Sequence, residues 1–365
     1  MSSLLLYLIL FIFCYIVLKI RFKHKKVCIR FGKIVFSEKI LDAITIAISI
    51  APIIYILWNR VDVGTDYRHY LTIYNDYTNW GYINDEIGLI GIMKLSDILG
   101  WGYKGFLLIA SLLGLGISSY AIKQVVDDDC YPIAMIMYLS LYFGPLCNII
   151  AQTIALSFVV LAYKYCINKR PILFLIFCLF GMLFHKSAIV ILPIYIIYNN
   201  GKWVVRLIGV LSLLGAVLIC IMPNSLYSLL NEVGLSNYLY VFDKKIPTFL
   251  YVLFYRTPLY IMEFIILYKN TDMNKSDDYC ITFWKWMLLL EVASCILGIS
   301  ISWGGRLVYY FSIAHVIIDT DIINNHSTMN RRLLTAGIFF AYYLIAFILM
   351  HFYSGFDGIM AYHLL

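Results

Sequence analysis

Long apolar runs recur along the whole of this 365-residue chain. An α-helix needs about 20 predominantly apolar residues to cross the hydrocarbon core of a bilayer, and runs close to that length follow one another here. The chain is 62% hydrophobic and only 13% charged, so a water-soluble fold would lack the polar residues to cover its surface. We therefore predict an all-α polytopic membrane protein that forms one integral membrane domain over residues 1–365.

Short polar joints divide the apolar runs into about twelve expected transmembrane helices. Their approximate limits are 3–20, 40–58, 103–121, 131–146, 149–167, 171–185, 187–199, 206–222, 246–268, 280–300, 307–323 and 333–350. The stretch 87–99 is apolar on one side and carries Lys94, Ser96 and Asp97 on the other. That pattern predicts an interfacial or re-entrant helix inside a longer outward segment near 59–102.

The joints alternate in charge, and this alternation predicts the orientation. One set is basic and begins with the cluster in residues 21–39. Because basic loops stay in the cytoplasm, we place this set inside and both chain termini outside. The net charge of +7 is explained by these joints and gives no sign of nucleic-acid binding. The nine cysteines form no CxxC pair, so we predict no metal site, no disulfide framework and no cofactor.

Chemically active side chains gather in the outward joints. They are Asp66, Tyr67 and Arg68 in "VGTDYRHY", Asn148 and Gln152 in "PLCNIIAQTIA", His185 and Lys186 in "MLFHKSAI", and Arg306 in "SWGGRLVYYF". Ionisable groups near a membrane are rare unless they face a partner or a water-filled cavity. We therefore expect these residues to share one outward cavity.

Each of these residues also has a structural interpretation. Asp66 could cap a helix, His185 could be a hydrogen-bonded structural histidine, and Lys186 could extend its ammonium to the interface. Arg68 could be a solvated headgroup contact. A further set, Arg256, Glu263, Lys285 and Glu291, falls inside expected spans, and there we predict structural ion pairs in which Glu263 or Glu291 neutralises Arg256 or Lys285.

The order of these motifs resembles the EpsG-like family of bacterial exopolysaccharide and O-antigen polymerases (Wzy-type). The resemblance rests on "GTDYRHY", on Glu86 before the interfacial stretch, on "NIIAQTIALSF" with the "FHKSAI" turn, and on "GGRLVYYF". It implies a multi-spanning, GT-C-like glycosyltransferase in the bacterial cytoplasmic membrane with an outward-facing active site. The family pattern has an arginine where this chain has Ala151, and Arg68 or Arg256 are candidates to replace it.

The resemblance also implies a reaction. A glycan is transferred from undecaprenyl pyrophosphate to a hydroxyl of a second lipid-linked repeat unit, without a metal. Asp66 and His185 are the candidate catalytic residues, because the acceptor hydroxyl needs a positioned base. Arg306 and then Arg68 are the candidates for the pyrophosphate, since guanidinium binds phosphate in a bidentate way. The remaining candidate substrate contacts are Glu86, Asn148, Gln152, Tyr67 and Lys186.

The candidate partners are the undecaprenyl-pyrophosphate-linked oligosaccharide, membrane lipids, and the chain-length regulator and flippase of the same pathway. Two other functions remain open. A lipid-linked oligosaccharide flippase would place charged groups along a path through the midplane, as the set around Arg256 and Glu291 could. A membrane O-acyltransferase of surface glycans would need a histidine inside a span, for which His315 is the candidate.

Overall fold

The computed structural model is almost entirely helical, as the apolar runs predict. It describes residues 3–23, 30–31, 34–35, 37–81, 86–222, 228, 232, 247–269, 279–300, 302–326 and 328–361. Strand structure among them is confined to two residues each in β1 (Arg30–Phe31) and β2 (Ile34–Val35), which pair in antiparallel fashion. The joint between the expected helices 206–222 and 246–268, which the alternation of the joints places outside, lies largely outside the described residues.

Seven helices in the described residues are long and apolar enough to cross a membrane: Ser3–Phe22, Glu38–Asn59, Gly102–Lys123, Ile150–Ile167, Lys202–Ile221, Thr282–Ser300 and Met329–Tyr353. Two shorter apolar helices cover Pro171–Phe184 and Lys186–Asn199. The chain is thus a polytopic membrane protein. The full number of about twelve spans, the orientation of the joints and the GT-C-like architecture stay predictions.

The chain divides into two compact units, which are described separately. Unit 1 comprises Met1–Lys164, Ile172–Ile189 and Ile323–Leu365. Its helices are α1 (Ser3–Lys23), α2 (Glu38–Asn59), α3 (Tyr67–Trp80), α4 (Ile87–Ile98), α5 (Gly102–Ser111), α6 (Ile117–Lys123), α7 (Tyr131–Asn148), α8 (Ile150–Ile167), α9 (Pro171–Phe184) and α19 (Met329–Phe347), with π-helical turns η1 (Leu112–Gly116) and η4 (Ile348–Tyr353) and 3₁₀ turns η2 (Lys186–Ile191) and η5 (Phe356–Ala361).

Unit 1 is built around α7, which packs against α1, α6, α19 and η5. Nearly every residue of α7 is buried, which fits the predominantly apolar sequence on all of its sides. Tyr7, Phe11, Phe143 and Phe347 join α1, α7 and α19 through aromatic contacts at centroid distances of 4.6–6.5 Å. In a bilayer such close packing holds helices together, because lipid is as apolar as the side chains.

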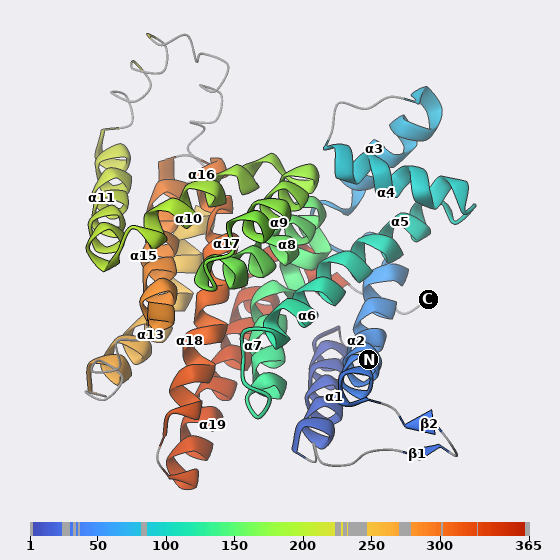
Figure 1. Cartoon of the computed structure of the whole chain (residues 1–365). Helices are drawn as coiled ribbons and strands as arrows, with labels where there is room; N and C mark the ends of the chain where they lie inside the picture. The colour runs from blue at the N-terminus through green and yellow to red at the C-terminus, as the bar shows by residue number, and fades with distance from the viewer. Residues whose placement is uncertain are drawn as a thin grey trace. The chain divides into compact units, whose positions relative to one another are not determined.

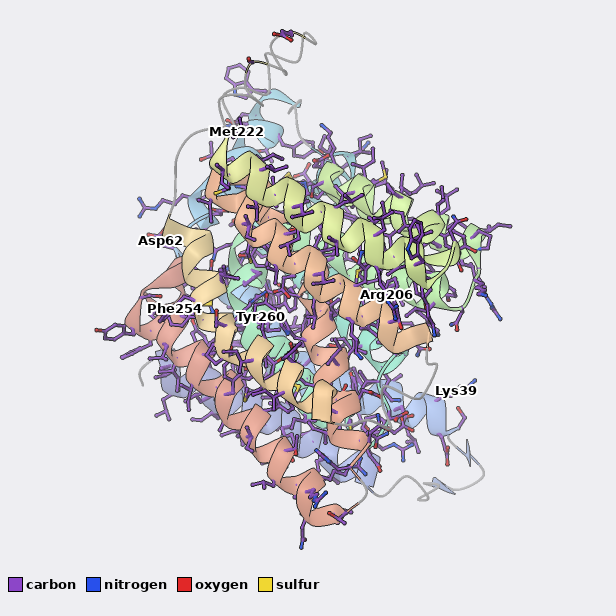
Figure 2. The ribbon with its side chains drawn as sticks, turned by 90° about the vertical axis from the view of Figure 1, so that its left-hand side faces the viewer. Lys39, Asp62, Arg206, Met222, Phe254 and Tyr260 are labelled. Carbon is purple, nitrogen blue, oxygen red and sulfur yellow. The ribbon has the colours of Figure 1, made fainter. Side chains whose placement is uncertain are left out.

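Unit 2 comprises Tyr165–Pro171 and Val190–Ile322. Its helices are α10 (Leu192–Asn199), α11 (Lys202–Ile221), α13 (Pro247–Lys269), α15 (Tyr279–Ser300), α16 (Ser302–Arg306), α17 (Val308–Phe311) and α18 (Ile313–Asn324). Helix α15 is the centre of this unit and packs against α11, α13, α16 and α17 (Figure 1). Figure 2 shows α11 alongside α15, with Arg206 near one end of α11 and Met222 at the other.

The predictions for the helices need three corrections, two of their limits and one of a side-chain position. The stretch 307–323 is not one helix, since the chain runs as α16, α17 and α18 with turns at Leu307 and Ser312. The Ser312 hydroxyl donates to the Val308 carbonyl at 2.7 Å, a bond that tends to bend helices. The stretch 187–199 starts as a 3₁₀ turn. Ser96 is buried rather than on the polar side of α4, because its hydroxyl donates to the Gly102 carbonyl at 2.6 Å.

Candidate active site

Five of the predicted site residues of unit 1 fall into two groups, and Tyr67, Arg68 and Gln152 belong to neither. The first group, here called the loop junction, consists of the Gly64–Asp66 loop between α2 and α3, Asn148 at the end of α7, and Asp357 and Gly358 in η5. The second, here called the turn cluster, consists of Glu86, His185 and Lys186. Arg306 lies in unit 2 at the end of α16 and is exposed.

Asn148 is the centre of the loop junction. Its carbonyl oxygen accepts from the Asp66 backbone N–H at 3.2 Å and from the Thr65 hydroxyl at 3.0 Å. Its amide nitrogen donates to the carbonyls of Gly144 at 3.1 Å and Asp357 at 2.9 Å. The oxygen thus meets only donors and the nitrogen only acceptors, which fixes the orientation of the amide. Asn148 therefore positions the loop that carries Asp66.

The tight approach of the loop to α7 requires a glycine. Gly64 has φ +95°, and a Cβ there would lie 2.8 Å from Asn148 Oδ1 and 2.9 Å from the Cys147 carbonyl. Two backbone bonds complete the contact with η5: the Gly64 N–H donates to the Gly358 carbonyl at 3.2 Å and the Thr65 N–H to the Asp357 carbonyl at 3.2 Å. The "GTD" motif is thus a loop that is held by α7 on one side and by η5 on the other.

Asp66 occupies the N-cap position of α3, but its side chain makes no capping hydrogen bond. Its carboxylate lies 3.3 Å from the Thr65 hydroxyl and is partly exposed. The backbone, and not the carboxylate, therefore anchors this residue, which leaves the carboxylate for another role. Tyr67 is buried against Tyr103 at a ring distance of 5.5 Å, so little of its surface faces solvent.

Asp357 was not among the predicted residues. It has φ +68°, an unfavourable backbone conformation for a residue with a side chain. One of its carboxylate oxygens has no hydrogen-bond partner within the described part of the chain and lies 3.7 Å from His351 Nδ1. Burial, and then the nearby Asp66, raises the pKa of Asp357 to about 7. The Gly-Phe-Asp-Gly sequence signals a tight turn, but nothing in it predicts that this turn meets residue 148.

Arg68 is committed to a neighbour. Its Nε and Nη2 lie 2.8 and 2.5 Å from the two carboxylate oxygens of Asp62, and its side chain is 81% exposed. This pair lowers the pKa of Asp62. Ala151, where the resemblance implies an arginine, is buried, and its N–H donates to the Tyr70 hydroxyl at 3.3 Å. Gln152, in the first turn of α8, is also buried.

Arg60 is a second residue that the sequence interpretation missed. It is 2% exposed, and its Nη1 lies 3.4 Å from the carbonyls of Leu57 and Leu146. Its Nε and Nη2 have no hydrogen-bond partner among the described residues. The buried guanidinium of Arg60 therefore lies beside α7, at the end of α2. In the sequence it directly precedes the acidic "VDVGTD" segment.

The turn cluster forms where α9 ends and η2 begins. A Glu86 oxygen accepts from the Lys186 backbone N–H at 3.1 Å and lies 3.5 Å from His185 Nδ1. The other Glu86 oxygen is 3.9 Å from the Lys186 ammonium, whose side chain is 81% exposed. The structure thus brings Glu86 to His185 and Lys186, which follow it by about 100 positions in the chain.

One of the ion pairs predicted inside the spans, Arg256 with Glu291, is confirmed, whereas Glu263 pairs with His315, a partner that was not predicted. Arg256 on α13 forms an ion pair with Glu291 on α15 and also contacts Ser312. His315 lies between two carboxylates, with Nδ1 2.7 Å from Glu263 and Nε2 2.8 Å from Glu291. We call these residues the buried ion network. Within the described ranges, no three His, Cys, Asp or Glu side chains form a group that could hold a metal ion.

The comparison with protein families gives one match. The model described as "EpsG family" matches residues 43–364, which is nearly the whole chain and includes both the loop junction and the turn cluster. This is a family of polysaccharide-polymerase-like proteins. Comparison with curated proteins and with solved structures gives no significant match.

Proposed function

The chain belongs to the EpsG family, and from this premise we propose that it is a polysaccharide polymerase of the glycosyltransferase type. It transfers a growing glycan from undecaprenyl pyrophosphate to a second lipid-linked repeat unit at the outer face of the cytoplasmic membrane. The observation that best supports this is the loop junction. A partly exposed carboxylate, that of Asp66, stands on a loop that Asn148 holds by its backbone.

Asp66 is the proposed base or positioning group for the acceptor hydroxyl. A general base must be held within hydrogen-bond reach of the proton that it removes. Asp66 is held in position because its backbone N–H donates to Asn148. Its carboxylate makes no capping bond and can therefore reach a substrate hydroxyl. Asp66 also lies near enough to Asp357 to help raise the pKa of that buried carboxyl group.

In a reaction without a metal, positively charged side chains must stabilise the negative charge of the leaving pyrophosphate. Arg306 is the proposed donor, because a planar guanidinium matches the phosphate oxygens and keeps its charge at all relevant pH values. Its exposed position in the "GGRL" turn supports this role. Arg68 is the weaker candidate, since Asp62 already occupies two of its donors. His185 and Lys186 are proposed contacts of a lipid phosphate.

The two other functions have less support. The buried ion network would be the path of a flippase, but its charges are paired with one another. His315 would be the histidine of an O-acyltransferase, yet both of its ring nitrogens lie within 2.8 Å of a carboxylate.

Deletion of the gene for this protein tests the proposal through the length of surface polysaccharide chains on gels. A polymerase mutant should display single repeat units. A mutant without surface polysaccharide would indicate a transporter. Full-length chains that lack acyl groups would indicate an acyltransferase, and either result would overturn the proposal.

A further inference from the structure

An apolar groove of about 800 Å³ runs beside the turn cluster. Its walls are formed by Ile87 at the start of α4 and by Ile176, Leu179, Phe180 and Leu183 on α9. Its polar lining consists of Glu86 and Lys186, which both lie next to the end of α9. A volume of several hundred Å³ is enough to enclose part of an organic ligand. The groove is thus apolar along its length and charged at one end.

The walls of the groove are preformed by close packing. A Cβ at Gly88 would lie 2.8 Å from the Phe184 ring and 2.9 Å from the Leu183 carbonyl, so α4 touches the end of α9 directly. Phe158 stacks on Phe180 and Phe184 at ring distances of 5.5 and 5.8 Å. The aromatic side chains behind the groove are therefore fixed, and a ligand would enter a surface that needs little rearrangement.

The charged end of the groove favours an anion. The Glu86 carboxylate is engaged with the chain through the Lys186 N–H and lies near His185. The Lys186 ammonium is 3.9 Å from Glu86 and its side chain is 81% exposed, a geometry that stabilises an ion pair only weakly. The ammonium is free to turn toward a phosphate, and it would bind it as a point charge.

We infer that this groove binds the isoprenoid chain of the polyprenyl-phosphate carrier, with the carrier phosphate at Lys186. The inference rests on the proposed function, because a polymerase of lipid-linked glycans must hold such a carrier at an outer joint. A single apolar groove with one cationic residue at its end matches one chain on one phosphate. A phospholipid would instead bring two acyl chains. The first isoprene units would lie against Leu179 and Phe180, and the rest of the chain would extend into the bilayer.

Photolabelling of the full-length protein tests this inference. The protein is reconstituted in phosphatidylcholine nanodiscs with undecaprenyl phosphate that carries a diazirine in its tail, and labelled peptides are mapped by mass spectrometry. Saturable labelling within residues 176–183 is expected. Unlabelled undecaprenyl phosphate should suppress it, whereas phosphatidylglycerol and inorganic phosphate at equal concentration should not.

Two matched substitutions locate the site. Leu179→Trp should fill the groove and weaken saturable labelling on the order of tenfold. The larger side chain takes the space of part of the isoprenoid tail, so the tail loses apolar contact equivalent to about one buried side chain. Leu175→Trp is the control, because Leu175 is equally exposed on α9, at 47% against 48%, but does not line the groove. Lys186→Gln should weaken labelling severalfold, and Lys186→Arg should restore it. Equal losses in the two tryptophan variants would overturn the inference.

The competition also separates this inference from the proposed function. Labelling that does not saturate would mean that α9 only faces bulk lipid, and labelling that phosphatidylglycerol suppresses equally well would mean a general anionic-lipid site. Both outcomes overturn the inference that the groove binds the carrier. The polymerase proposal is then still tested separately by the chain length in the deletion strain. Saturable, selective labelling in a protein whose deletion leaves chain length unchanged would support the groove and reject the polymerase.

Discussion

The loop junction of unit 1 and the buried ion network of unit 2 use polar residues in opposite ways. The junction is held by hydrogen bonds of neutral groups, among which the Asn148 amide makes four. The network buries two basic side chains and two carboxylates, and each charged group contacts one of opposite sign. In the junction, the carboxylate of Asp66 is left partly exposed.

This difference suggests how to separate structural from functional charges in such a chain. A charge whose partners are buried with it contributes to holding helices together, and removing one partner is costly. A charge whose backbone is fixed by others while its own side chain stays accessible is available for chemistry. Residue type alone does not separate the two kinds, although Asp66 follows an apolar run and Glu291 lies within one.

The largest effect is expected from breaking the network. Glu291→Leu leaves Arg256 buried without its carboxylate, and loss of one partner of a buried ion pair costs about 3–5 kcal/mol. We expect little protein in the membrane fraction and a much lower unfolding temperature in detergent. The double variant Arg256→Leu/Glu291→Leu should recover part of both, because His315 and Glu263 then remain as a balanced pair. Losses that simply add in the double variant would contradict the pairing.

The next effect concerns activity rather than stability. Asp66→Asn keeps the shape of the side chain and the backbone bond from Asn148, but it removes the base. We expect normal protein amounts and a fall in polymerisation on the order of a hundredfold, measured as chain length on gels. Asp76→Asn is the matched control, because Asp76 is an exposed acid on the same helix α3. Long chains made at near wild-type rates by Asp66→Asn would remove Asp66 from the mechanism.

The sequence predicts the helices well and the contacts between distant segments only in part. Apolar runs of membrane-spanning length give the limits of α13 and α15 to within one residue and those of α1, α2 and α11 to within four, because lipid imposes a minimum length. The break at Leu307 and Ser312 was missed, since a bend caused by packing and a serine back-bond leaves the hydropathy unchanged.

For the site, residue type and the expected side of the membrane selected Asp66, Asn148 and His185, and the family resemblance added Glu86. They did not show that these residues form two groups, because the grouping depends on which helix ends meet. Asp357 could not be found in this way. It follows the last apolar helix by a few residues, and only the tertiary fold brings its turn to the Gly64–Asp66 loop. The proposed single outward cavity, including Arg306, stays a prediction.

A smaller effect is expected from loosening the junction. Asn148→Ala removes four hydrogen bonds around one buried side chain and leaves the Asp66 N–H and Asp357 carbonyl with one partner fewer. We expect a loss of about 1–3 kcal/mol of local stability, seen as faster hydrogen exchange in peptides that cover residues 60–70. Asn59→Ala, which removes one exposed bond to the Tyr55 carbonyl, is the control and should change little. Equal changes in the two variants would show that Asn148 does not anchor the loop.

The smallest effect is a pH dependence of the same junction. The pKa of Asp357 is raised from 3.8 to about 7, so the folded junction binds a proton that the opened chain releases at lower pH. Local stability is therefore fully present below about pH 4 and falls as pH rises through 7. Between pH 6 and 7 the opening equilibrium should increase about fivefold.

Hydrogen exchange of the Gly64 and Thr65 amides, corrected for intrinsic rates, measures this opening, because both amides bond to η5. A charged His351, 3.7 Å away, would oppose the trend at low pH, so His351→Gln should make it steeper. Asp357→Asn carries no titrating group and should remove the slope while the backbone bonds remain. A slope that persists in Asp357→Asn would assign the titration to another group, and opening that decreases with rising pH would show that Asp357 is ionised in the folded junction.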